Sequence, residues 1–419
     1  MNSMIDYSDA LKIIIETATL LPAESIQLED AMGATVAVDQ PSPAAVPPFD
    51  NSAMDGFAVY SSDTADASSE HPVTLPVIGT VTAGEAVTGK SGKAGTAWEI
   101  MTGAPVPAGY DGVVPVEQVE TQRDSAGKPV SITLTEPIHA GRNLRATGED
   151  FSAGDALVHA GQYIQANQIM GLAATGVNEI SARRPARVAA ITTGNELTDA
   201  ANAQPLEPGM IHDSNGPYLE AAISSIGATS AGVYRTGDSA EELISLIEDL
   251  QDKTDVILTT GGVSAGRMDF VPMALEQMGA DILFHRVAIR PGKPILFARL
   301  MNGTLIFGLP GNPIAVAVGL RFFVVPALRQ MQGLPEEEYL TASITHTMGK
   351  KQGMRFFAKA QAMSNDAGQL EVEALPGQES FKISPLMSAN CWLIADKETD
   401  ELTAGSLVKI APLYPGSFP

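Results

Sequence analysis

The chain has 419 residues and a formal net charge of −23, with 26 basic and 49 acidic residues. The small number of bases contributes more to this charge than the number of acids does. This length predicts two to four domains, and the negative charge argues against binding to nucleic acids or anionic membranes. No uninterrupted apolar run approaches the ~18–20 residues that span a bilayer. The acidic N-terminal stretch lacks the bases of an export signal, and a single cysteine, Cys391, excludes an internal disulfide. We therefore expect a cytoplasmic protein.

The first half of the chain predicts one helix followed by a β-rich region. Apolar residues recur at helical spacing over 7–21, with Ser8 or Asp9 as the expected N-cap. The proline-rich stretch 41–48 is typical of a stiff, extended connection. From about 50 to 140 the sequence is rich in Val and Thr and is broken by Gly and Pro every few residues, which indicates a small β domain. One more helix is predicted at 166–175.

Strand–helix alternation begins at 186 and continues to about 332. Such alternation predicts a doubly wound α/β domain with a parallel sheet. The short strands and Gly/Pro turns from 336 to 419 then predict a terminal all-β domain. Within the α/β region we expect strands at 187–193, 228–234, 255–260, 282–289, 294–299 and 304–309, and helices at 215–226, 239–251, 270–279 and 313–330.

Three glycine-rich turns follow apolar strands in this region. They are ITTGNEL at 191–197, LTTGGVSAGRMDF at 258–270 and LPGNP at 309–313. In an open α/β sheet, ligands bind where loops leave the carboxyl ends of strands, and glycines there let backbone N–H groups approach an anion. Glu196 and Asp269 lie in the same loops, which indicates a phosphate bound together with a divalent cation. The sequence contains no P-loop, dinucleotide-binding, zinc or serine-hydrolase motif.

Three further segments outside the α/β region combine tight turns with polar or charged side chains. PPFDNSAMDGFAVY (47–60) places Asp55 in a tight turn after rigid prolines, IMTGAPVP (100–107) ends a strand at Thr-Gly, and GRNLRATGEDF (141–151) joins two arginines to a Glu-Asp pair. Taken singly, each segment is more often structural than functional. Asp55, for example, has the alternative role of capping its own turn.

Together these segments resemble one family. NSAMDGFAV, IMTGAPVP, TGED, TTGNEL, GGVSAGRMD, RPGKP and GLPGNP occur in the order found in molybdopterin molybdenumtransferases, the molybdenum insertases that include the E domain of gephyrin. The resemblance implies a homodimer of elongated subunits. It also implies a reaction in which molybdate and adenylated molybdopterin give molybdenum cofactor and AMP, with a divalent metal.

The fold that the resemblance implies is multidomain α/β plus β. A composite N-terminal domain (1–45 and 141–185) would carry an inserted β domain (46–140). A doubly wound parallel α/β domain that binds molybdopterin (186–333) and a C-terminal β-barrel-like domain (334–419) would follow.

The resemblance also implies roles for individual residues. Glu196 and Asp269 would hold Mg²⁺, a hard cation that prefers oxygen ligands. Asp55, Thr102 and Asp150 lie outside the α/β domain, which implies a cleft completed across domains or by the second subunit. The expected catalytic residues are Asp55, Thr102, Asp150, Glu196, Asp238 and Asp269. The expected cofactor-binding residues are Thr193, Gly194, Gly261, Gly262, Ser264, Arg286, Arg290, Lys293, Pro310, Asn312 and Pro313.

The chain departs from the family pattern at two places. The family often has a Gln-Gly-Ser-His-like stretch near its C-terminus, where this chain reads GQESFKISPLMSANCW (377–392), with Glu379 and Phe381 at the altered positions. This departure argues against substrate contacts from the terminal domain and leaves the role of 377–392 open. TTGNEL has Asn195 where an acid is frequent, which removes one charge from the expected metal shell.

Two other functions compete with molybdenum insertion. Molybdopterin adenylation is the preceding step, and an enzyme of that kind needs only the α/β domain. A non-catalytic scaffold, as in relatives of gephyrin, is the other. The β domains and NSAMDGFAV favour insertion over adenylation, and the acids at every motif position argue against a purely structural role. The expected protein partners are the molybdopterin adenylyltransferase and molybdoenzymes.

Overall fold

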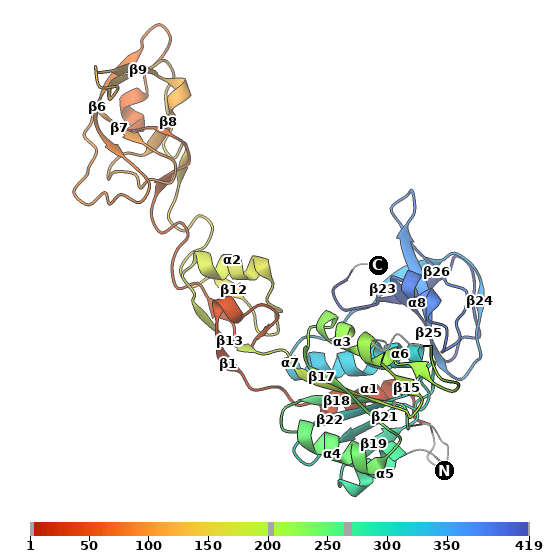
Figure 1. Cartoon of the computed structure of the whole chain (residues 1–419). Helices are drawn as coiled ribbons and strands as arrows, with labels where there is room; N and C mark the ends of the chain where they lie inside the picture. Colours follow the sequence, from red (N-terminus) through yellow and green to blue (C-terminus); the bar gives the residue numbers. More distant parts are fainter. Residues whose placement is uncertain (1–3, 200–204, 264–269, 418–419) are drawn as a thin grey trace.

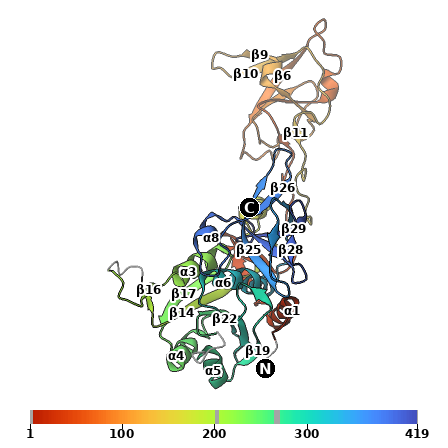
Figure 2. The ribbon, with the colours of Figure 1, turned by 90° about the vertical axis from the view of Figure 1, so that its right-hand side faces the viewer.

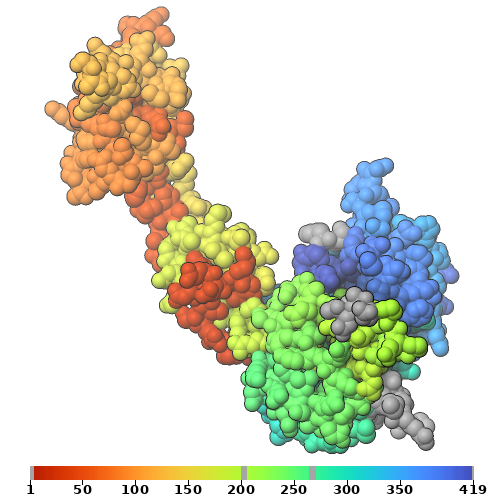
Figure 3. Space-filling view, in the orientation of Figure 1, coloured from red at the N-terminus to blue at the C-terminus, as the bar shows by residue number. Residues whose placement is uncertain are grey.

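The computed structural model describes residues 4–199, 205–263 and 270–417. The molecule is elongated (Figures 1 and 3). A β-rich part stands at one end, a small mixed part follows, and the α/β part with a C-terminal β part forms the other end. The side view in Figure 2 again shows the β-rich part clear of the α/β sheet. Multidomain α/β plus β architecture, as expected from the sequence, is confirmed.

The β-rich end is a six-stranded half-barrel without an α-helix among its described residues. Phe57, Leu75 and Ile132 are buried at its centre. Two single-turn 3₁₀-helices, Ser61–Thr64 and Val116–Gln118, are the only helical segments in it. The strand order is β8 (Gly112–Pro115), β5 (Gly56–Val59), β7 (Ala97–Ile100), β6 (Val73–Val81), β10 (Pro129–Leu134) and β9 (Glu120–Arg123).

A short neck joins this end to the middle part. Val46 and Phe151 exchange backbone hydrogen bonds of 2.7 and 3.1 Å. β4 (Asn51–Ser52) pairs with β11 (Leu144–Arg145), and β3 (Gln40–Pro41) pairs with β12 (Ala156–Val158). The chain thus leaves and returns along adjacent antiparallel segments.

Segments from both sides of the neck build the middle part. β13 (Glu179–Arg183) lies between β1 (Glu24–Gln27) and β2 (Thr35–Val36) and is antiparallel to both. α2 (Ala166–Ala174), the helix expected at 166–175, covers the sheet and buries Leu172. A single-turn 3₁₀-helix, Leu28–Asp30, lies beside it.

The α/β part is a six-stranded sheet with helices on both faces. Alternate residues of β14 face opposite cores: Val188 and Ala190 pack with α1 (Tyr7–Thr17), α3, α6 and α7, whereas Ala189 and Ile191 pack with α4 and α5. The strand order is β17 (Thr229–Thr236), β14 (Arg187–Thr193), β18 (Val256–Thr260), β22 (Leu305–Leu309), β21 (Leu296–Arg299) and β19 (Asp281–His285). The helices are α3 (Asn215–Ser225), α4 (Ala240–Leu250), α5 (Phe270–Gln277), α6 (Pro313–Gly319) and α7 (Val325–Gln332).

The expected parallel order holds for four of these strands. β17, β14, β18 and β22 are parallel, but β21 is antiparallel to β22 and to β19. The short connection between β21 and β22 explains the difference, because it is long enough for a hairpin and too short for a helical crossover. A small parallel pair, β15 (Leu197–Thr198) with β16 (Ile211–His212), lies beyond the end of β14.

The run Pro313–Gln332 has the length and hydropathy of a membrane span, although it is interrupted by Arg321. It contains α6, a π-helical turn at Leu320–Val324 and α7. Within its 18-residue apolar window 83% is buried inside the protein. It therefore forms the core helix of the α/β part.

The first helix, α1 (Tyr7–Thr17), is capped differently from the expectation. The N-cap is Asp6, whose side chain accepts a hydrogen bond from the backbone N–H of Ser8, so the assignment to Ser8 or Asp9 is wrong. The sequence places this helix in the composite N-terminal domain, but it packs against α7, with Tyr7 and Ile14 in the α/β core. The boundaries of the four expected domains stay predictions.

The C-terminal part is a closed five-stranded barrel. β25 (Arg355–Ser364) pairs with both β26 (Leu370–Ala374) and β27 (Cys391–Ala395), and the ring continues through β23 (Leu340–Ile344) and β29 (Leu407–Pro412). The remaining elements are β20 (Ile289–Arg290) beside β25, the pair β24 (Met348–Gly349) and β28 (Glu401–Leu402), and α8 (Ser384–Ser388).

Aromatic residues join the barrel to the α/β part. Phe357 of β25 stacks on Phe322 of the π-helical turn, with ring centroids 4.0 Å apart, and Tyr7 packs edge-on against Phe357 and Phe323. Trp392 of β27 belongs to the same buried cluster. These two parts therefore share one hydrophobic core.

Candidate active site

The three glycine-rich turns meet at one edge of the α/β sheet. β14, β18 and β22 are adjacent and parallel, so the loops after Thr193, Thr260 and Leu309 leave the sheet side by side. The Thr193 hydroxyl donates to the carbonyl of Thr260 at 2.9 Å, and the N–H of Gly261 donates to the carbonyl of Leu309 at 3.0 Å. The end of β14 is thus bonded to the end of β18, and the loop after β18 is bonded to the end of β22.

Glycine is required where these loops approach one another. Gly261 has φ +93°, and a Cβ there would lie 2.6 Å from Oγ1 of Thr193. Gly262 has φ +63°, and its Cβ would lie 2.8 Å from the Phe270 ring. At Gly194 a Cβ would lie 2.6 Å from Oε2 of Glu196, so the Glu196 carboxylate lies directly against the glycine backbone.

Acidic and amide groups tie the loop after β14 to the loop after β17. The N–H of Asn195 donates to Oδ2 of Asp238, and the N–H of Asp238 donates to Oδ1 of Asn195, both at 3.4 Å. Glu196 and Asp238 are both exposed. This edge therefore presents two carboxylates to solvent beside the glycine loops.

The expected metal site draws on residues inside and outside the described part of the chain. Asp269 and Ser264 lie outside the described residues. Among the residues that are described, no three His, Cys, Asp or Glu side chains gather as a metal site. The donor chemistry of Glu196 nevertheless fits Mg²⁺, which is commonly bound by one or two carboxylates together with substrate oxygens.

A pocket of about 430 Å³ lies between the glycine loops and the barrel. Two exposed bases, Arg290 and Lys293, line it together with Gly262, Pro310 and Asn312. Arg290 lies in β20, which pairs with β25 of the barrel. Its guanidinium carbon lies 5.9 Å from the Phe356 ring centroid. A second hollow of about 200 Å³ shares Arg290 and adds Lys350 and Lys351. The site is therefore locally cationic in a strongly acidic chain.

The barrel contributes the opposite wall of the pocket. Gln378, Glu379, Ser380 and Phe381 line it, all from the segment that departs from the family pattern. The carbonyl of Ser380 accepts a hydrogen bond of 3.1 Å from the N–H of Ile314, in the first turn of α6. The barrel thus brings this segment against the α/β part and into the pocket wall, although its departure from the family pattern argued against substrate contacts there. No local sequence signal marks this approach.

Some expected site residues surround the pocket without lining it. Thr193 ends β14, Gly194 and Gly261 lie in the adjoining loops, and Pro313 begins α6. Arg286, which has φ +78°, is held by backbone hydrogen bonds to Ile295 and Ile5 and is not among the lining residues described.

Asp55 and Thr102 contact each other at the β-rich end. Oδ1 of Asp55 accepts from both the N–H and the hydroxyl of Thr102, each at 2.7 Å. These bonds, the backbone one first, hold the pKa of the exposed Asp55 carboxyl below its usual range. Asp50 makes the same two bonds with Thr147, at 2.8 Å each.

Asp150 lies at the neck, where its N–H donates to the carbonyl of Val46. Within one chain, the end that carries Asp55 and Thr102 stands away from the sheet edge that carries Glu196 and Asp238 (Figure 1). The five expected catalytic residues that the structure describes, all except Asp269, therefore do not form one cluster within a single chain.

Three family models match the chain. The MoeA N-terminal region (domain I and II) matches residues 5–176, a probable molybdopterin binding domain matches 189–330, and the MoeA C-terminal region (domain IV) matches 341–413.

Curated relatives and solved structures match along almost the whole length. A molybdopterin molybdenumtransferase from Synechococcus elongatus is 34% identical over 414 residues, covering 98% of this chain and 100% of the relative. Molybdopterin molybdenumtransferase 2 from Mycobacterium tuberculosis is 34% identical over 411 residues, covering 95% of this chain and 97% of the relative. The crystal structure of a molybdopterin biosynthesis MoeA protein from Pyrococcus horikosii superposes with a TM-score of 0.80 at 30% identity, covering 98% of this chain and 99% of that one.

Proposed function

Because this chain belongs to the molybdopterin molybdenumtransferase (MoeA) family, we propose that it transfers molybdenum from molybdate into adenylated molybdopterin and releases AMP. Membership makes the chain a transferase of molybdenum cofactor biosynthesis that acts on molybdopterin and molybdenum. The adenylated form of the substrate and the release of AMP are the parts proposed here.

The pocket between the glycine loops and the barrel is the observation that carries this proposal. Molybdate and a phosphoanhydride are both anions, and they need N–H groups and bases to offset their charge. Arg290 and Lys293 supply the bases within a pocket of about 430 Å³, and Gly262 and Asn312 supply backbone that a ligand can approach. Arg gives a forked contact to an oxyanion, and Lys gives a point charge.

In this scheme each wall of the pocket has a separate task. The glycine loops bind the phosphates, while Arg290 and Lys293 orient molybdate against the substrate. The barrel segment Gln378–Phe381 closes the opposite side and limits access of water. Glu196, Asp269 and the substrate oxygens would hold Mg²⁺, which would offset the charge of the phosphoanhydride.

The remaining catalytic assignments require a second subunit. Asp55, Thr102 and Asp150 are proposed to complete the site of a two-fold partner, because they stand far from Glu196 and Asp238 in their own chain (Figure 1). The protein is proposed to work in the cytoplasm and to receive its substrate from the molybdopterin adenylyltransferase.

The deciding experiment supplies the purified protein with adenylated molybdopterin, molybdate and Mg²⁺ and measures both AMP and active molybdenum cofactor. We expect the two products in equal amounts, and neither when molybdate is omitted. Molybdopterin with ATP should give no adenylated product. Adenylation activity would instead support the preceding step, and the absence of turnover with either substrate pair would support a scaffold.

The metal assignment has its own test. Glu196→Gln keeps the size and hydrogen bonding of the side chain and removes its charge, so we expect a higher Mg²⁺ concentration for half-maximal AMP release. The melting temperature should stay nearly unchanged, because substitutions in exposed loops usually have small effects on stability. An unaltered Mg²⁺ dependence would remove Glu196 from the metal site.

A further inference from the structure

One fully buried lysine in the barrel is unused by the scheme above. Lys359 lies in the middle of β25, between Ala358 and Ala360, and its exposed fraction is 0%. A buried ammonium is costly unless its donors are bonded. Among the described residues, no carboxylate forms a salt bridge with Lys359. Its charge must therefore be compensated in another way.

Three backbone carbonyls provide the compensation. The Nζ of Lys359 donates to the carbonyls of Gly377, Glu379 and Lys382, at 2.7, 3.3 and 3.0 Å. An ammonium group has three N–H donors, so these three bonds use all of them. All three acceptors lie in one short segment, 377–382, which has no regular secondary structure and would otherwise expose its carbonyls to water.

The same segment supplies the barrel wall of the pocket. Gln378, Glu379, Ser380 and Phe381 line it, interleaved with the carbonyls that Lys359 binds. Gln378 is itself fixed to β25, because its amide accepts from the N–H of Lys359 at 3.0 Å and donates to the carbonyl of Lys359 at 2.8 Å. The backbone of residue 359 thus fixes Gln378, and the Lys359 ammonium fixes the carbonyls of Gly377, Glu379 and Lys382 around it, although Lys359 does not line the pocket.

The segment has few other anchors to the rest of the molecule. The hydrogen bond from Ile314 to Ser380 joins it to α6, and an ion pair of 3.0 Å between Lys382 and Glu379 lies within the segment itself. Phe381 is 64% exposed, so its ring does not anchor the segment by burial.

We propose that Lys359 is a positioning residue for substrate binding, whose ammonium holds segment 377–382 against the pocket. This inference rests on the proposed function for the identity of the ligand. It assigns to the barrel a role in binding adenylated molybdopterin or molybdate, exerted through backbone carbonyls and not through direct contact.

Lys359→Met tests the proposal in the full chain, because Met keeps much of the volume and removes all three donors. We expect KM for adenylated molybdopterin or molybdate to rise about 10- to 100-fold, the scale of a small displacement of a binding group, with a smaller change in kcat. Lys359→Arg keeps a buried cation with several donors and should recover most of the loss. Lys409→Met is the matched control, since Lys409 is an exposed barrel lysine that bonds only to the Thr341 hydroxyl in the described residues.

Hydrogen exchange of the ligand-free protein gives a readout that does not depend on activity. Lys359→Met should accelerate exchange in 376–383 while β25, β26 and β27 stay protected. If Lys359→Met does not fold, Lys359→Gln replaces it, because Gln retains a donor without the charge.

The outcomes separate the two proposals. An inactive wild-type protein would count against the proposed function, and the exchange measurement would still decide whether Lys359 holds the segment. Wild-type KM and wild-type exchange in Lys359→Met would overturn the inference. A fall in kcat alone would also overturn it, as would failure of both Met and Gln variants to fold, since Lys359 would then serve the barrel as a whole.

Discussion

Two aspartates near the neck make the same contacts but have different assignments. Asp55 and Asp50 are both exposed, and each accepts from the N–H and hydroxyl of one threonine. If these bonds only connect loops, then the two residues are equivalent. If Asp55 also acts on the substrate of a partner subunit, then replacing it has an effect that replacing Asp50 does not.

Asp55→Asn should lower molybdenum insertion by about 10²-fold, the scale for loss of one key electrostatic group. Asn retains most of the turn hydrogen bonding, so the melting temperature should change by less than about 2 °C. Asp50→Asn is the matched control and should insert molybdenum at nearly the wild-type rate. Equal rates for both variants and the wild type would mean that Asp55 has only the turn role.

Gly261 allows a second residue-level prediction. Gly261→Ala places a methyl group against Thr193 and strains a backbone at φ +93°. Gly279→Ala has a similar φ of +70° but nothing within 4 Å of the new methyl group. We expect Gly279→Ala to lower the free energy of unfolding by about 1–2 kcal/mol from backbone strain alone, and Gly261→Ala to cost about 1–3 kcal/mol more from overpacking.

Urea unfolding would measure this difference in the free energy of unfolding. Hydrogen exchange of β14 and β18 would show whether the cost is local to these strands. Insertion activity should fall only in Gly261→Ala. Equal costs for the two variants would show that the loop after β18 moves to admit a side chain.

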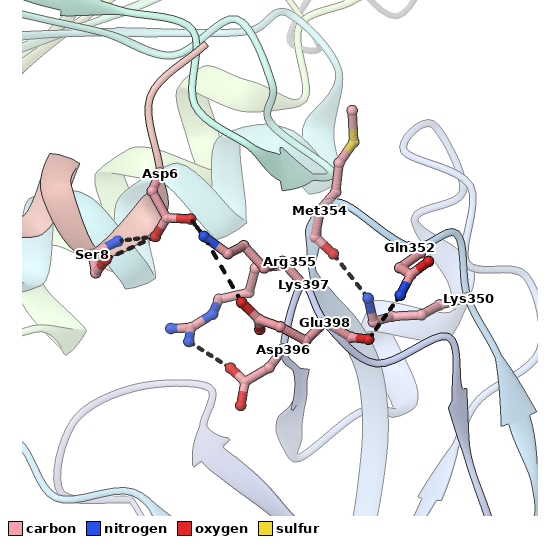
Figure 4. A network of polar contacts seen from close by, with 9 residues as sticks. All are labelled: Asp6, Ser8, Lys350, Gln352, Met354, Arg355, Asp396, Lys397 and Glu398. Atoms are coloured by element: carbon pink, nitrogen blue, oxygen red, sulfur yellow. Dashed lines mark hydrogen bonds and ion pairs between the residues drawn. The ribbon is translucent and has the colours of Figure 1, made fainter.

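Among the elements, the segment that precedes α1 connects the α/β part to the barrel. Ile5 bridges Val287, next to β20, and Asp6 forms an ion pair with Lys397 of the barrel (Figure 4). Lys397 also contacts Glu398, and Arg355 pairs with Asp396 in the same network. Arg355 lies 4.6 Å from the Tyr7 ring centroid. The segment is therefore fixed on both sides.

This network predicts a pH dependence of stability. The hydrogen bond from Lys397 is the main cause that lowers the pKa of Asp6 from 3.8 to about 2. A lowered carboxyl pKa stabilises the folded state fully above pH 3.8, and this contribution is lost as the pH falls through about 2. Allowing for partial solvent screening, we expect Asp6→Asn to cost about 1–2 kcal/mol at pH 7.

The cost of Asp6→Asn should shrink between pH 4 and pH 2. Fluorescence of the buried Trp392 in a Trp98→Phe background would report unfolding of the α/β–barrel unit, because Trp98 lies in the β-rich end. Glu16→Gln, which removes an exposed pair with Lys12, is the control and should change little. A cost that is the same at pH 7 and pH 3 would contradict the ion-pair explanation.

The sequence predicted well those helices and strands whose own residues show a clear apolar run or apolar periodicity. β14 has the expected bounds, 187–193, and α2 lies within one residue of its prediction. The antiparallel edge was missed because buried strands have the same apolar pattern in either direction. The N-cap was misplaced because Asp6 precedes the periodic apolar stretch by one residue, and Ser8 donates to it instead of capping.

The candidate site was predictable where one loop follows one strand. Gly262, Arg290, Lys293, Pro310 and Asn312 come from short motifs, and the structure places them around one pocket. The wall at 377–382 was not predictable, because its position depends on barrel closure and on a buried lysine. A lysine in a strand ordinarily indicates an exposed position.

At the scale of the whole molecule, the elongated shape predicts sites shared between subunits. Light scattering should show a two-fold dimer at micromolar concentration. At a Mg²⁺ concentration too low to support Glu196→Gln, Asp55→Asn and Glu196→Gln should each be nearly inactive as homodimers. Co-expressed in equal amounts, they should recover about a quarter of wild-type activity, because half of the dimers are mixed and one of their two sites has both acids intact.

Activity that does not recover in the mixed dimers would place both acids in the same chain's site. The control is co-expression of Asp55→Asn with Asp150→Asn, whose acids lie on the same side of the neck. This pair should recover no activity, since every site then lacks one of the two.

The hydrogen-bonded contact of Val46 with Phe151 has a consequence for how such chains diversify. The segment between Val46 and Phe151 begins and ends at two hydrogen-bonded residues. It can therefore be deleted, inserted or exchanged by joining two backbone positions that are already adjacent. The entropy of closing a loop grows only slowly with its length, so the size of the exchanged module matters little to the remainder. The neck is therefore a natural junction for recombination, at which a lineage or a designer can change the reach of the subunit while the α/β part and the barrel keep their own contacts.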